Sequence, residues 1–371
     1  MARVRWGVLS TASIGRLVIE ATRAAGHAEF VAVASRDADR ARAFADELGL
    51  EASYGSYEEL LASRAVDAIY VPLPVALHTE WTIKALEAGK DVLCEKPLAT
   101  SAADAARCFD AAEAASRRCV EGLMYRHHPQ TTLARKLVAD GAIGRLAYIR
   151  AALTVSVPPD DIRRSVALGG GALGDLGCYC ASAVRLFAGE PTRVAATQVR
   201  DSDAGVDLRM AATLRLPGDV LAQFDVALDL TRRDELELVG TEGRLVVPDP
   251  WLCRASHLEL SRDGRVERVP VDPEGTLGLT DPDHDVYRVE LDTVSAALAG
   301  GGEPSFGRSD AIAQATVLEA LYRSAELGTP VAVGSAGGCC AGVPAPKTAE
   351  NRSRATLSSP EAYASSPTVP R

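Results

Sequence analysis

Short apolar runs alternate with amphipathic segments through the first third of the chain. Runs of strand length occupy residues 4–9, 30–34, 68–71, 91–94 and 119–124, with helical patterns between them at 14–25, 37–48, 57–63, 79–88 and from 101 onward. The runs contain few polar residues, which is typical of parallel strands covered on both faces. Strict alternation of strand and helix implies right-handed crossovers. Residues 1–124 are therefore predicted to form a doubly wound parallel sheet of the Rossmann type.

The pattern changes after Tyr125, where strands follow one another with little helix between them. Strands are predicted at 146–155, 193–200, 206–216, 220–228, 235–239 and 245–248, and helices at 131–140, 283–299 and 309–327. Residues 125–333 are therefore expected to form an α+β domain with an open, largely antiparallel sheet. Residues 334–371 are rich in Gly, Ala, Ser, Pro and Thr without an apolar period, which predicts a disordered tail.

The overall charge limits the classes of partner. The chain carries a formal net charge of -10, which argues against nucleic acid or an anionic membrane. No apolar run approaches the length of a membrane span, and the first residues do not form a secretory signal. The eight cysteines include no C-x-x-C pair, and no His, Asp and Glu triplet has metal-site spacing. We therefore expect a cytoplasmic protein that uses no metal ion.

The turn after the first strand is a candidate site for a dinucleotide. Its residues are Ser10, Thr11, Ala12, Ser13 and Ile14. They are followed by Gly15, which is all that remains of the usual glycine fingerprint. The small side chains would still let backbone N–H groups approach a pyrophosphate at a helix N-terminus. Taken alone, an ordinary strand–helix turn is the alternative interpretation.

Ser35 and Arg36 follow the second strand, where an NAD-binding protein usually has an acidic residue on the ribose diol. An arginine at this position can pair with a 2′-phosphate instead. NADP is therefore the predicted cofactor, with NAD as the alternative. An exposed arginine at a helix start is the competing interpretation of Arg36.

Further cofactor contacts are predicted along the carboxyl edge of the sheet, where the crevice of a doubly wound fold lies. The residues are Pro72, Leu73, His78, Glu95, Lys96 and Arg126. For His78, capping the next helix or orienting the loop is favoured over proton transfer.

Two segments carry residues suited to proton transfer. Lys96 follows a strand in Glu95-Lys96-Pro97, while Asp175 and Tyr179 are four residues apart and therefore share a helix face. Reduction of a carbonyl needs a proton for the developing alkoxide. A tyrosine, with an ordinary pKa near ~10, needs a nearby cation to act as a base at neutral pH. Without further context, Lys96 would be an exposed strand-end lysine and Tyr179 a half-buried core residue.

With these segments the chain resembles the glucose–fructose oxidoreductase, inositol dehydrogenase and rhizopine-catabolism (Gfo/Idh/MocA) family over about residues 4–333. The resemblance rests on the Rossmann-like first third, on Glu95-Lys96-Pro97 and on GGGALGDLGCY at 169–179. It is nearest to the branch of dimeric dihydrodiol dehydrogenases and NADP-dependent D-xylose dehydrogenases, which shares MYRHHPQ at 124–130 and a tyrosine at the position of Tyr179. VPPDDIR at 157–163 is similar to the nucleotide-sugar 3-ketoreductases of the family.

The resemblance implies roles for Tyr179 and Lys96. Tyr179 would donate and accept the proton, and Lys96 would lower the pKa of Tyr179 and position the substrate. Asp175, one helical turn before Tyr179 on the same face, can bind a substrate hydroxyl or orient the lysine. The resemblance also implies a cis peptide bond before Pro97. The second domain would bind substrate and form a homodimer or homotetramer through its open sheet face.

The expected function is NAD(P)-dependent hydride transfer between nicotinamide and a sugar or polyol carbon, either an aldose C1 or a ring keto group. Three alternatives remain open: a nucleotide-sugar 3-ketoreductase of deoxysugar biosynthesis, an NAD-dependent glycosidase, and a non-catalytic NADP-binding regulator. Arg36 and Tyr179 argue against an NAD-dependent glycosidase. Arg163 and Arg164 could meet a substrate phosphate or form a solvated surface pair.

Overall fold

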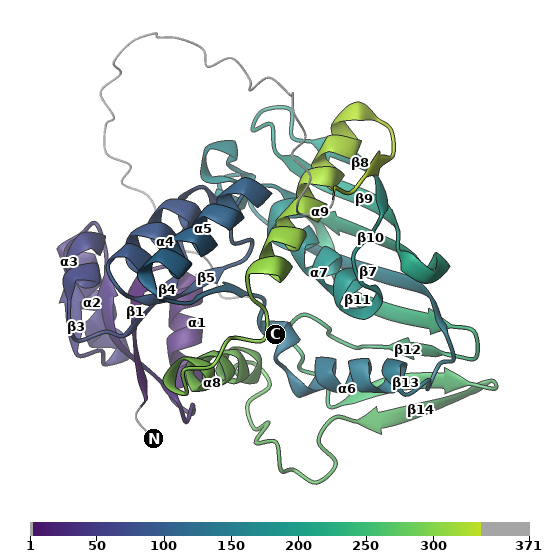
Figure 1. Ribbon diagram of the computed structural model, residues 1–371, viewed down its shortest axis with the longest axis horizontal. Coiled ribbons are helices and arrows are strands. Elements are labelled where there is room, and N and C mark those ends of the chain that lie inside the picture. The colour runs from purple at the N-terminus through teal and green to yellow at the C-terminus, as the bar shows by residue number, and fades with distance from the viewer. Residues whose placement is uncertain (1–2, 335–371) are drawn as a thin grey trace. The chain divides into compact units, whose positions relative to one another are not determined.

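The computed structural model describes residues 3–334, which fall within one compact unit. The predicted tail lies outside the described residues except for Gly334. Figure 1 shows two sheets, one in the N-terminal and one in the C-terminal part of this unit. The division into domains at residues 124 and 125 stays a prediction, because the described residues are not separated into two units.

The first sheet is parallel and has the strand order β3-β2-β1-β4-β5-β6. Its strands are β1 Val4–Leu9, β2 Ala28–Ala34, β3 Ala52–Tyr54, β4 Ala68–Val71, β5 Asp91–Glu95 and β6 Cys119–Gly122. The helices between them are α1 Ser13–Thr22, α2 Ala38–Leu48, α3 Tyr57–Ala62, α4 His78–Glu87 and α5 Ala102–Ala115. The order reverses between β1 and β4, which confirms the predicted Rossmann topology and places the crevice at their carboxyl ends.

The second sheet is mixed and mostly antiparallel, in the order β14-β13-β12-β11-β7-β10-β9-β8-β15, with only β7 and β10 paired in parallel. Its strands are β7 Leu146–Ser156, β8 Arg193–Arg200, β9 Asp207–Arg215, β10 Leu221–Ala227, β11 Asp229–Gly240, β12 Arg244–Val246, β13 His257–Arg262, β14 Arg265–Pro270 and β15 Val331–Ala332. The predicted α+β part is confirmed. The sequence prediction missed β3, β13 and the edge strands β14 and β15.

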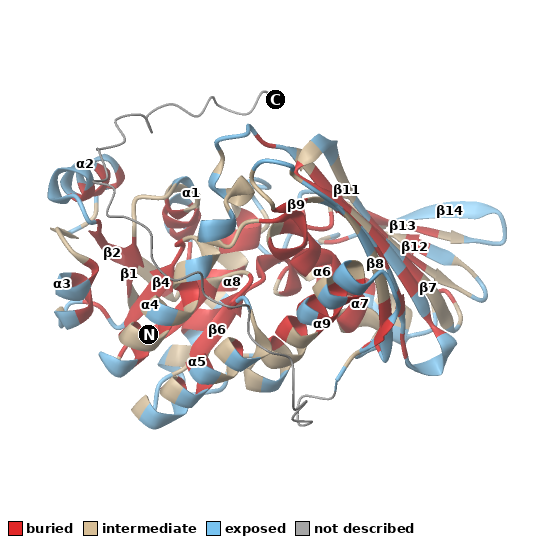
Figure 2. Ribbon diagram, turned by 90° about the horizontal axis from the view of Figure 1, so that it is seen from above, coloured by how far each residue is buried: buried red, intermediate tan, exposed pale blue. Residues whose placement is uncertain are grey.

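Helices of the second part cover one face of its sheet and leave the other face open (Figure 2). They are α6 Pro129–Ala139, α7 Cys178–Ala188 and α9 Arg308–Leu327, whereas α8 Asp285–Ala299 lies against the first sheet. Short helical turns precede them: η2 Met124–Arg126, η3 Ile162–Arg164, η4 Val166–Leu168 and the π-helix η5 Leu173–Gly177, with η1 Val75–Leu77 before α4 and η6 Pro217–Asp219 between β9 and β10.

The last two helices of the described chain return to the first sheet. α8 packs against α1 and β1, and α9 packs against α5. The indole nitrogen of Trp6 in β1 donates to the hydroxyl of Ser295 in α8 at 2.9 Å. Because Trp6 is fully buried, truncating it to alanine would cost about 3–5 kcal/mol. The C-terminal helices therefore join the second part of the protein to the Rossmann sheet and its helices.

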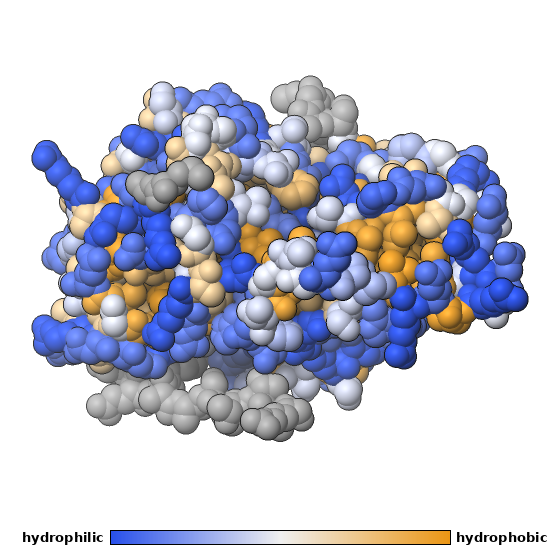
Figure 3. Space-filling view, turned by 90° about the horizontal axis from the view of Figure 1, so that it is seen from below, coloured by the Kyte–Doolittle hydropathy of each residue, from blue (hydrophilic) through white to orange (hydrophobic). Residues whose placement is uncertain are grey.

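The surface is mainly hydrophilic on the side seen from below, with separate hydrophobic areas, one of them on the side of the second sheet (Figure 3). Among residues 3–334, no helix combines the length and the apolar character needed to span a bilayer.

Candidate active site

Lys96, Asp175 and Tyr179 meet at the carboxyl end of β5. The Nζ atom of Lys96 donates to the backbone oxygen of Asp175 at 2.7 Å and to its Oδ1 at 2.8 Å. The same Nζ lies 5.0 Å from the centre of the Tyr179 ring, within the range of a cation–π contact. The Lys96–Pro97 bond is cis, as the resemblance implies. The structure therefore brings together the three residues that the sequence pointed to.

The local fold places Asp175 and Tyr179 on adjoining turns. Asp175 lies in the π-helix η5, which leads directly into α7, and Tyr179 is the second residue of α7. A Cβ on Gly177 would lie 2.6 Å from Cδ1 of Leu173, so a larger residue here would require the Leu173 side chain to shift. Single π-turns of this kind often occur at functional sites.

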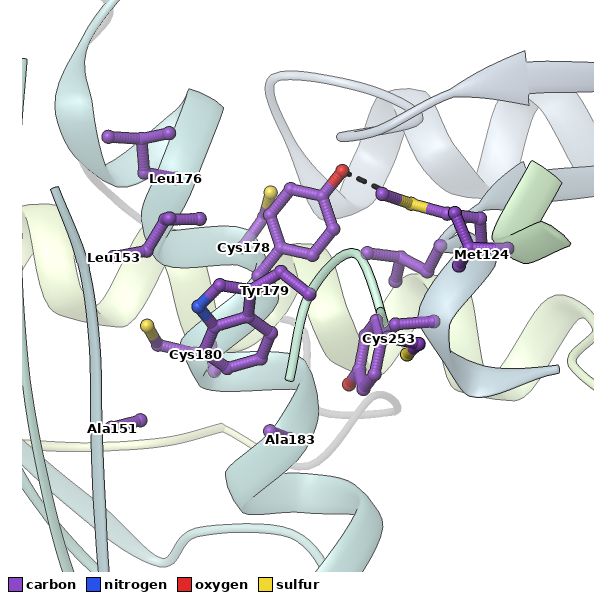
Figure 4. Close-up of a cluster of buried hydrophobic side chains, with 14 of the residues drawn as sticks. Met124, Ala151, Leu153, Leu176, Cys178, Tyr179, Cys180, Ala183 and Cys253 are labelled. Carbon is purple, nitrogen blue, oxygen red and sulfur yellow. Dashed lines mark hydrogen bonds between the residues drawn. The ribbon is translucent and has the colours of Figure 1, made fainter. Parts of the chain in front are cut away.

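The hydroxyl of Tyr179 does not face Lys96. It donates to the Sδ atom of Met124 at 3.3 Å, and Figure 4 shows it directed at this methionine. The ring packs among buried residues, with the rings of Tyr125 and Trp251 at 6.1 and 5.9 Å. Tyr179 is only 7% exposed.

The pKa of Tyr179 is raised well above its ordinary value, first by burial and then by Tyr287 and Glu95. The expected lowering of this pKa by Lys96 is therefore wrong for this structure, because the ammonium faces the ring and not the oxygen. Tyr179 is a protonated phenol, which suits a proton donor better than a base.

Lys96 is held as an ammonium. Burial alone would lower its pKa, but the charges of Asp175, Cys178 and Glu95 and the hydrogen bond to Asp175 together outweigh burial, and the pKa of Lys96 is raised. An ammonium has three N–H donors, and Asp175 uses two of them. The third remains available for an oxygen atom of a bound molecule.

Glu95 has partners within the protein. Its Oε1 accepts from the hydroxyl of Tyr70 at 2.7 Å and its Oε2 accepts from the backbone N–H of Lys96 at 3.3 Å. Burial raises the pKa of Glu95. These contacts fix the strand end from which Lys96 extends. They give no direct support to the prediction that Glu95 touches the cofactor.

Tyr287 in α8 is a residue that sequence reasoning missed. It is 6% exposed, and its hydroxyl makes no hydrogen bond to any described residue. Its pKa is raised by burial, by Glu95 and by Glu290, while Lys96 opposes the shift. Tyr287 therefore belongs to the surroundings of Lys96. No local signal marks it, because it resembles any aromatic residue in the first turn of a helix.

His78 joins two loops of the carboxyl edge. Its Nδ1 lies 2.8 Å from the oxygen of Pro97 and its Nε2 lies 2.6 Å from the oxygen of Leu73. The side chain is buried, and burial lowers its pKa. The favoured structural role of His78 fits these contacts. For Pro72 and Leu73, only their place in this loop supports the predicted cofactor contact.

The turn after β1 fits a dinucleotide phosphate. Ser10 has a φ of 99°, a left-handed conformation that normally favours glycine. α1 begins at Ser13 without a side-chain cap from Ala12. The N–H of Gly15 donates to the oxygen of Ala12 at 3.0 Å, which leaves the N–H groups of Ser13 and Ile14 to face an anion. The serine therefore occupies the backbone conformation that a glycine would have in the usual fingerprint. Thr11 and Ile14 lie in the same turn.

Two arginines without an ion pair among the described residues lie near the end of β2. Arg36 is exposed. It lies between Ser35 and Asp37, where the Oγ of Ser35 accepts a hydrogen bond from the N–H of Asp37 at 3.2 Å. Burial raises the pKa of Tyr57, while Arg36 and Arg40 act on it in the opposite direction. Both guanidinium groups therefore lie near this phenol. Arg40 was not predicted from the sequence, although its place one helical turn after Arg36 could have indicated it.

Arg126 is bound inside the protein. Its side chain is 2% exposed and pairs with Asp310 of α9, and its Nε donates to Ser182 at 2.7 Å. Its guanidinium also lies 4.7 Å from the ring of Phe306. The predicted cofactor contact of Arg126 gains no support from these partners, which give it a structural role between η2 and α9.

Arg163 and Arg164 are both paired with carboxylates. Arg163 binds Asp161 at 2.8 Å, and its Nη1 lies 4.0 Å from Oδ2 of Asp175. Arg164 binds Asp201 at 2.8 Å. The two arginines therefore add little free positive charge beside the site. Within residues 3–334, no group of three or more His, Cys, Asp or Glu side chains could hold a metal ion.

Comparisons with known proteins agree with this geometry. Residues 4–123 match the model of the GFO/IDH/MocA oxidoreductase family with an NAD-binding Rossmann fold, and residues 131–246 match the GFO/IDH/MocA C-terminal domain. The chain is 39% identical to D-xylose 1-dehydrogenase (NADP(+)) 2 of Haloferax volcanii, over 88% of this chain and 98% of the relative.

Two further relatives are a reductase named for a nucleotide-linked sugar and a 3-ketoreductase of known structure. dTDP-3,4-didehydro-2,6-dideoxy-alpha-D-glucose 3-reductase of Streptomyces violaceoruber is 39% identical over 87% of this chain and 96% of its own. The crystal structure of KijD10, a 3-ketoreductase from Actinomadura kijaniata in complex with NADP and TDP-benzene, has a TM-score of 0.78 and 32% identity. The similarity covers 87% of this chain and 98% of the KijD10 chain. From its fold, its site and these matches, the chain belongs to the GFO/IDH/MocA family of NAD(P)-dependent oxidoreductases.

Proposed function

We propose that this protein transfers hydride between NADP and a carbon of a neutral sugar or polyol, at an aldose C1 or a ring keto group. The observation that carries the proposal is the contact of Lys96 with Asp175, beside the ring of Tyr179, at the carboxyl edge of the Rossmann sheet. Hydride donors and acceptors of the nicotinamide class bind at this edge. When bound, the cofactor supplies or accepts the hydride.

The protein would supply the proton and the geometry. The free N–H of Lys96 binds the substrate oxygen that becomes an alkoxide during reduction. The Tyr179 hydroxyl turns from Met124, whose thioether is a weak acceptor, and donates its proton to this oxygen. Such proton transfer contributes about 10²–10⁴-fold to a rate, and holding the reactants in line contributes more.

The preference for NADP is supported by Arg36 and Arg40. A 2′-phosphate carries the charge that separates NADP from NAD, and two guanidinium groups without carboxylate partners suit it. Relatives whose names include NADP are consistent with this preference. The turn at Ser10 would then hold the pyrophosphate.

The proposed substrate is neutral because Arg163 and Arg164 are already paired. A phosphate would have to displace Asp161 or Asp201 to reach them. The second candidate is a nucleotide-sugar 3-ketoreductase, which is favoured by the 3-reductase relatives. An NAD-dependent glycosidase is disfavoured by Arg36 and Tyr179. A non-catalytic regulator would not need Lys96, Asp175 and Tyr179 in one place.

We also propose a homodimer or homotetramer built on the open face of the second sheet. Small side chains, including Ala195, Ala211 and Thr213, line a shallow depression of about 670 Å³ on this face. The charged residues Arg150, Asp225 and Glu237 also line it, so a second sheet packed on this face would meet both small and charged side chains. The expected compartment is the cytoplasm, since the six described cysteines are all free and buried.

The test is an assay of D-xylose, D-glucose, myo-inositol and a dTDP-linked keto sugar with both cofactors, following the absorbance of reduced nicotinamide. Turnover of a neutral sugar with NADP is expected, and Tyr179→Phe should lower kcat strongly while the affinity for NADPH is kept. Turnover of the dTDP-linked sugar alone would favour the second candidate. No turnover of any compound would refute the proposed reaction.

A further inference from the structure

The start of the segment that carries Asp175 and Tyr179 has no cap of its own. The first N–H groups of a helix lack partners inside the helix. Ala172, which precedes η5, provides no side-chain cap. The partners come instead from β9 and α9, which lie later in the chain.

Asp207, the first residue of β9, provides the missing acceptor. Its Oδ2 accepts from the backbone N–H of Leu173 at 2.7 Å. Its Oδ1 accepts from the hydroxyl of Tyr322 at 3.2 Å. The Tyr322 oxygen in turn accepts from the N–H of Gly174, also at 3.2 Å. Both oxygens of this carboxylate are therefore used, directly or through Tyr322, to hold the first two residues of η5.

The backbone around Asp207 is shaped to admit it. Asp207 is 5% exposed, and a Cβ on Gly171 would lie only 2.1 Å from its Oδ1. Gly171 also has a φ of 137°. The third glycine of 169–171 is thus required by the approach of the carboxylate. A negative charge at a helix N-terminus is favourable as well.

The position of η5 determines the position of Lys96. One of the two hydrogen bonds from Lys96 goes to the backbone oxygen of Asp175. The position of the ammonium therefore depends on the position of the η5 backbone, as well as on the Asp175 side chain. A shift of the first turn would move Asp175 and Tyr179 together. A misplacement of about 1 Å can cost about 10²-fold in rate.

We propose that Asp207 is a positioning residue of the active site, which acts through Leu173 and Tyr322 to hold Asp175 and Tyr179 against Lys96. The inference rests on the proposed function of these three residues. It assigns Asp207 no contact with substrate or cofactor.

The test compares Asp207→Ala with Asp91→Ala as a matched control. Asp91 is also buried, and it accepts from the backbone N–H of Arg118 at 2.7 Å, outside the proposed active site. Both variants should lose stability. Only Asp207→Ala should lower kcat/KM, by about 10- to 100-fold, with the affinity for NADPH unchanged by calorimetry. Asp207→Asn keeps an acceptor for the N–H of Leu173, so its kcat/KM should be close to that of the wild type.

A double-mutant comparison separates positioning from a general effect. In an Asp175→Asn background, Asp207→Ala should cost less than in the wild type, because part of its effect passes through Asp175. A folded Asp207→Ala protein with wild-type kcat and KM would overturn the inference. So would a loss of NADPH affinity as large as the loss of activity. If Asp207→Ala does not fold, Tyr322→Phe is measured instead. A wild-type kcat/KM in Tyr322→Phe would then overturn the inference.

Amide hydrogen exchange of residues 169–180 makes the inference independent of the sugar assay. Faster exchange there in Asp207→Ala than in Asp91→Ala is expected, and equal exchange would contradict the proposed hold on η5. If the wild type turns over none of the sugars, the proposed function fails, while this measurement still decides whether Asp207 holds the segment.

Discussion

Asp175 binds Lys96 through two atoms at once, its backbone oxygen at 2.7 Å and its Oδ1 at 2.8 Å. The first contact fixes the ammonium relative to the helix, and the second neutralises part of its charge. A single residue therefore sets the direction of the lysine and, with Cys178 and Glu95, raises its pKa. The third N–H of Lys96 is left for a bound oxygen atom.

Replacing Lys96 by methionine should lower kcat by about 10²–10⁴-fold, because the alkoxide loses its cationic partner. Steady-state kinetics with the best sugar would measure this loss. Lys84→Met is a matched control, since Lys84 also contacts a carboxylate, Glu80 at 2.6 Å, and an aromatic ring, Trp81 at 4.1 Å. Equal activities of the two variants would rule out a special role of Lys96.

The pH dependence follows from the raised pKa values of Lys96 and Tyr179. Both groups bind their protons more tightly in the folded than in the unfolded protein. Their contribution to stability is therefore complete below the ordinary values near ~10 and decreases as the pH rises above them. For the same reason, the rate of the proton-donating direction should stay flat from neutral pH to about 10.

A pH profile of kcat/KM for reduction, with a denaturation series at each pH, checks this prediction. A decline of the reduction rate near neutral pH that is absent from Tyr179→Phe would contradict it. That result would indicate a lowered pKa of Tyr179 in the presence of bound ligands.

Replacing Arg36 and Arg40 by alanine should weaken NADP binding and leave NAD binding nearly unchanged. Each lost charge-assisted hydrogen bond to a phosphate is worth about 1.5–3 kcal/mol, so about 10- to 100-fold is expected per arginine. Calorimetry with both cofactors measures the difference. Arg42→Ala serves as the control, because Arg42 is on the same helix but pairs with Asp39. Parallel losses for NADP and NAD would argue against a 2′-phosphate site.

Ser10 should accept glycine but not a branched side chain. With a φ of 99°, Ser10→Gly should leave the free energy of unfolding unchanged or raise it by up to ~1 kcal/mol, whereas Ser10→Val should lower it by about 1–3 kcal/mol. Chemical denaturation measures both. Ser13→Val, in the first turn of α1 with ordinary helical backbone, should cost less. A similar cost at both positions would show that the turn is not strained at Ser10.

Local pattern was enough to predict the elements that lie in the core. The apolar runs of β1, β2, β4, β5 and β6 could be read because both faces of these strands are buried. β13 and the edge strand β14 were missed. β14 exposes most of its residues and alternates weakly, and β13 is a short strand of six residues beside it. Asp37 caps the second helix by accepting from the backbone N–H groups of Asp39 and Arg40. Caps of this kind depend on neighbours in the sequence and can be predicted from them.

Motif reasoning located Lys96, Asp175 and Tyr179, but it did not give their orientation. The direction of the Tyr179 hydroxyl depends on Met124 and on the packing of Trp251, which approaches from a distant loop. Arg126 was expected at the cofactor because it follows the sixth strand. α9 instead brings Asp310 to it from 184 positions away.

The sequence by itself determined the fold class, the family and the identity of the three residues at the site, because periodicity, turn chemistry and short motifs are local properties of a chain. Only the tertiary structure decided that Lys96 faces the ring and not the oxygen of Tyr179. It also decided that Tyr287 lies near Lys96 and that Asp207 caps the segment beginning at Leu173. Each of these depends on which side chains meet when elements far apart in the chain pack together. The electrostatic and hydrogen-bonding state of a buried group is set by those neighbours.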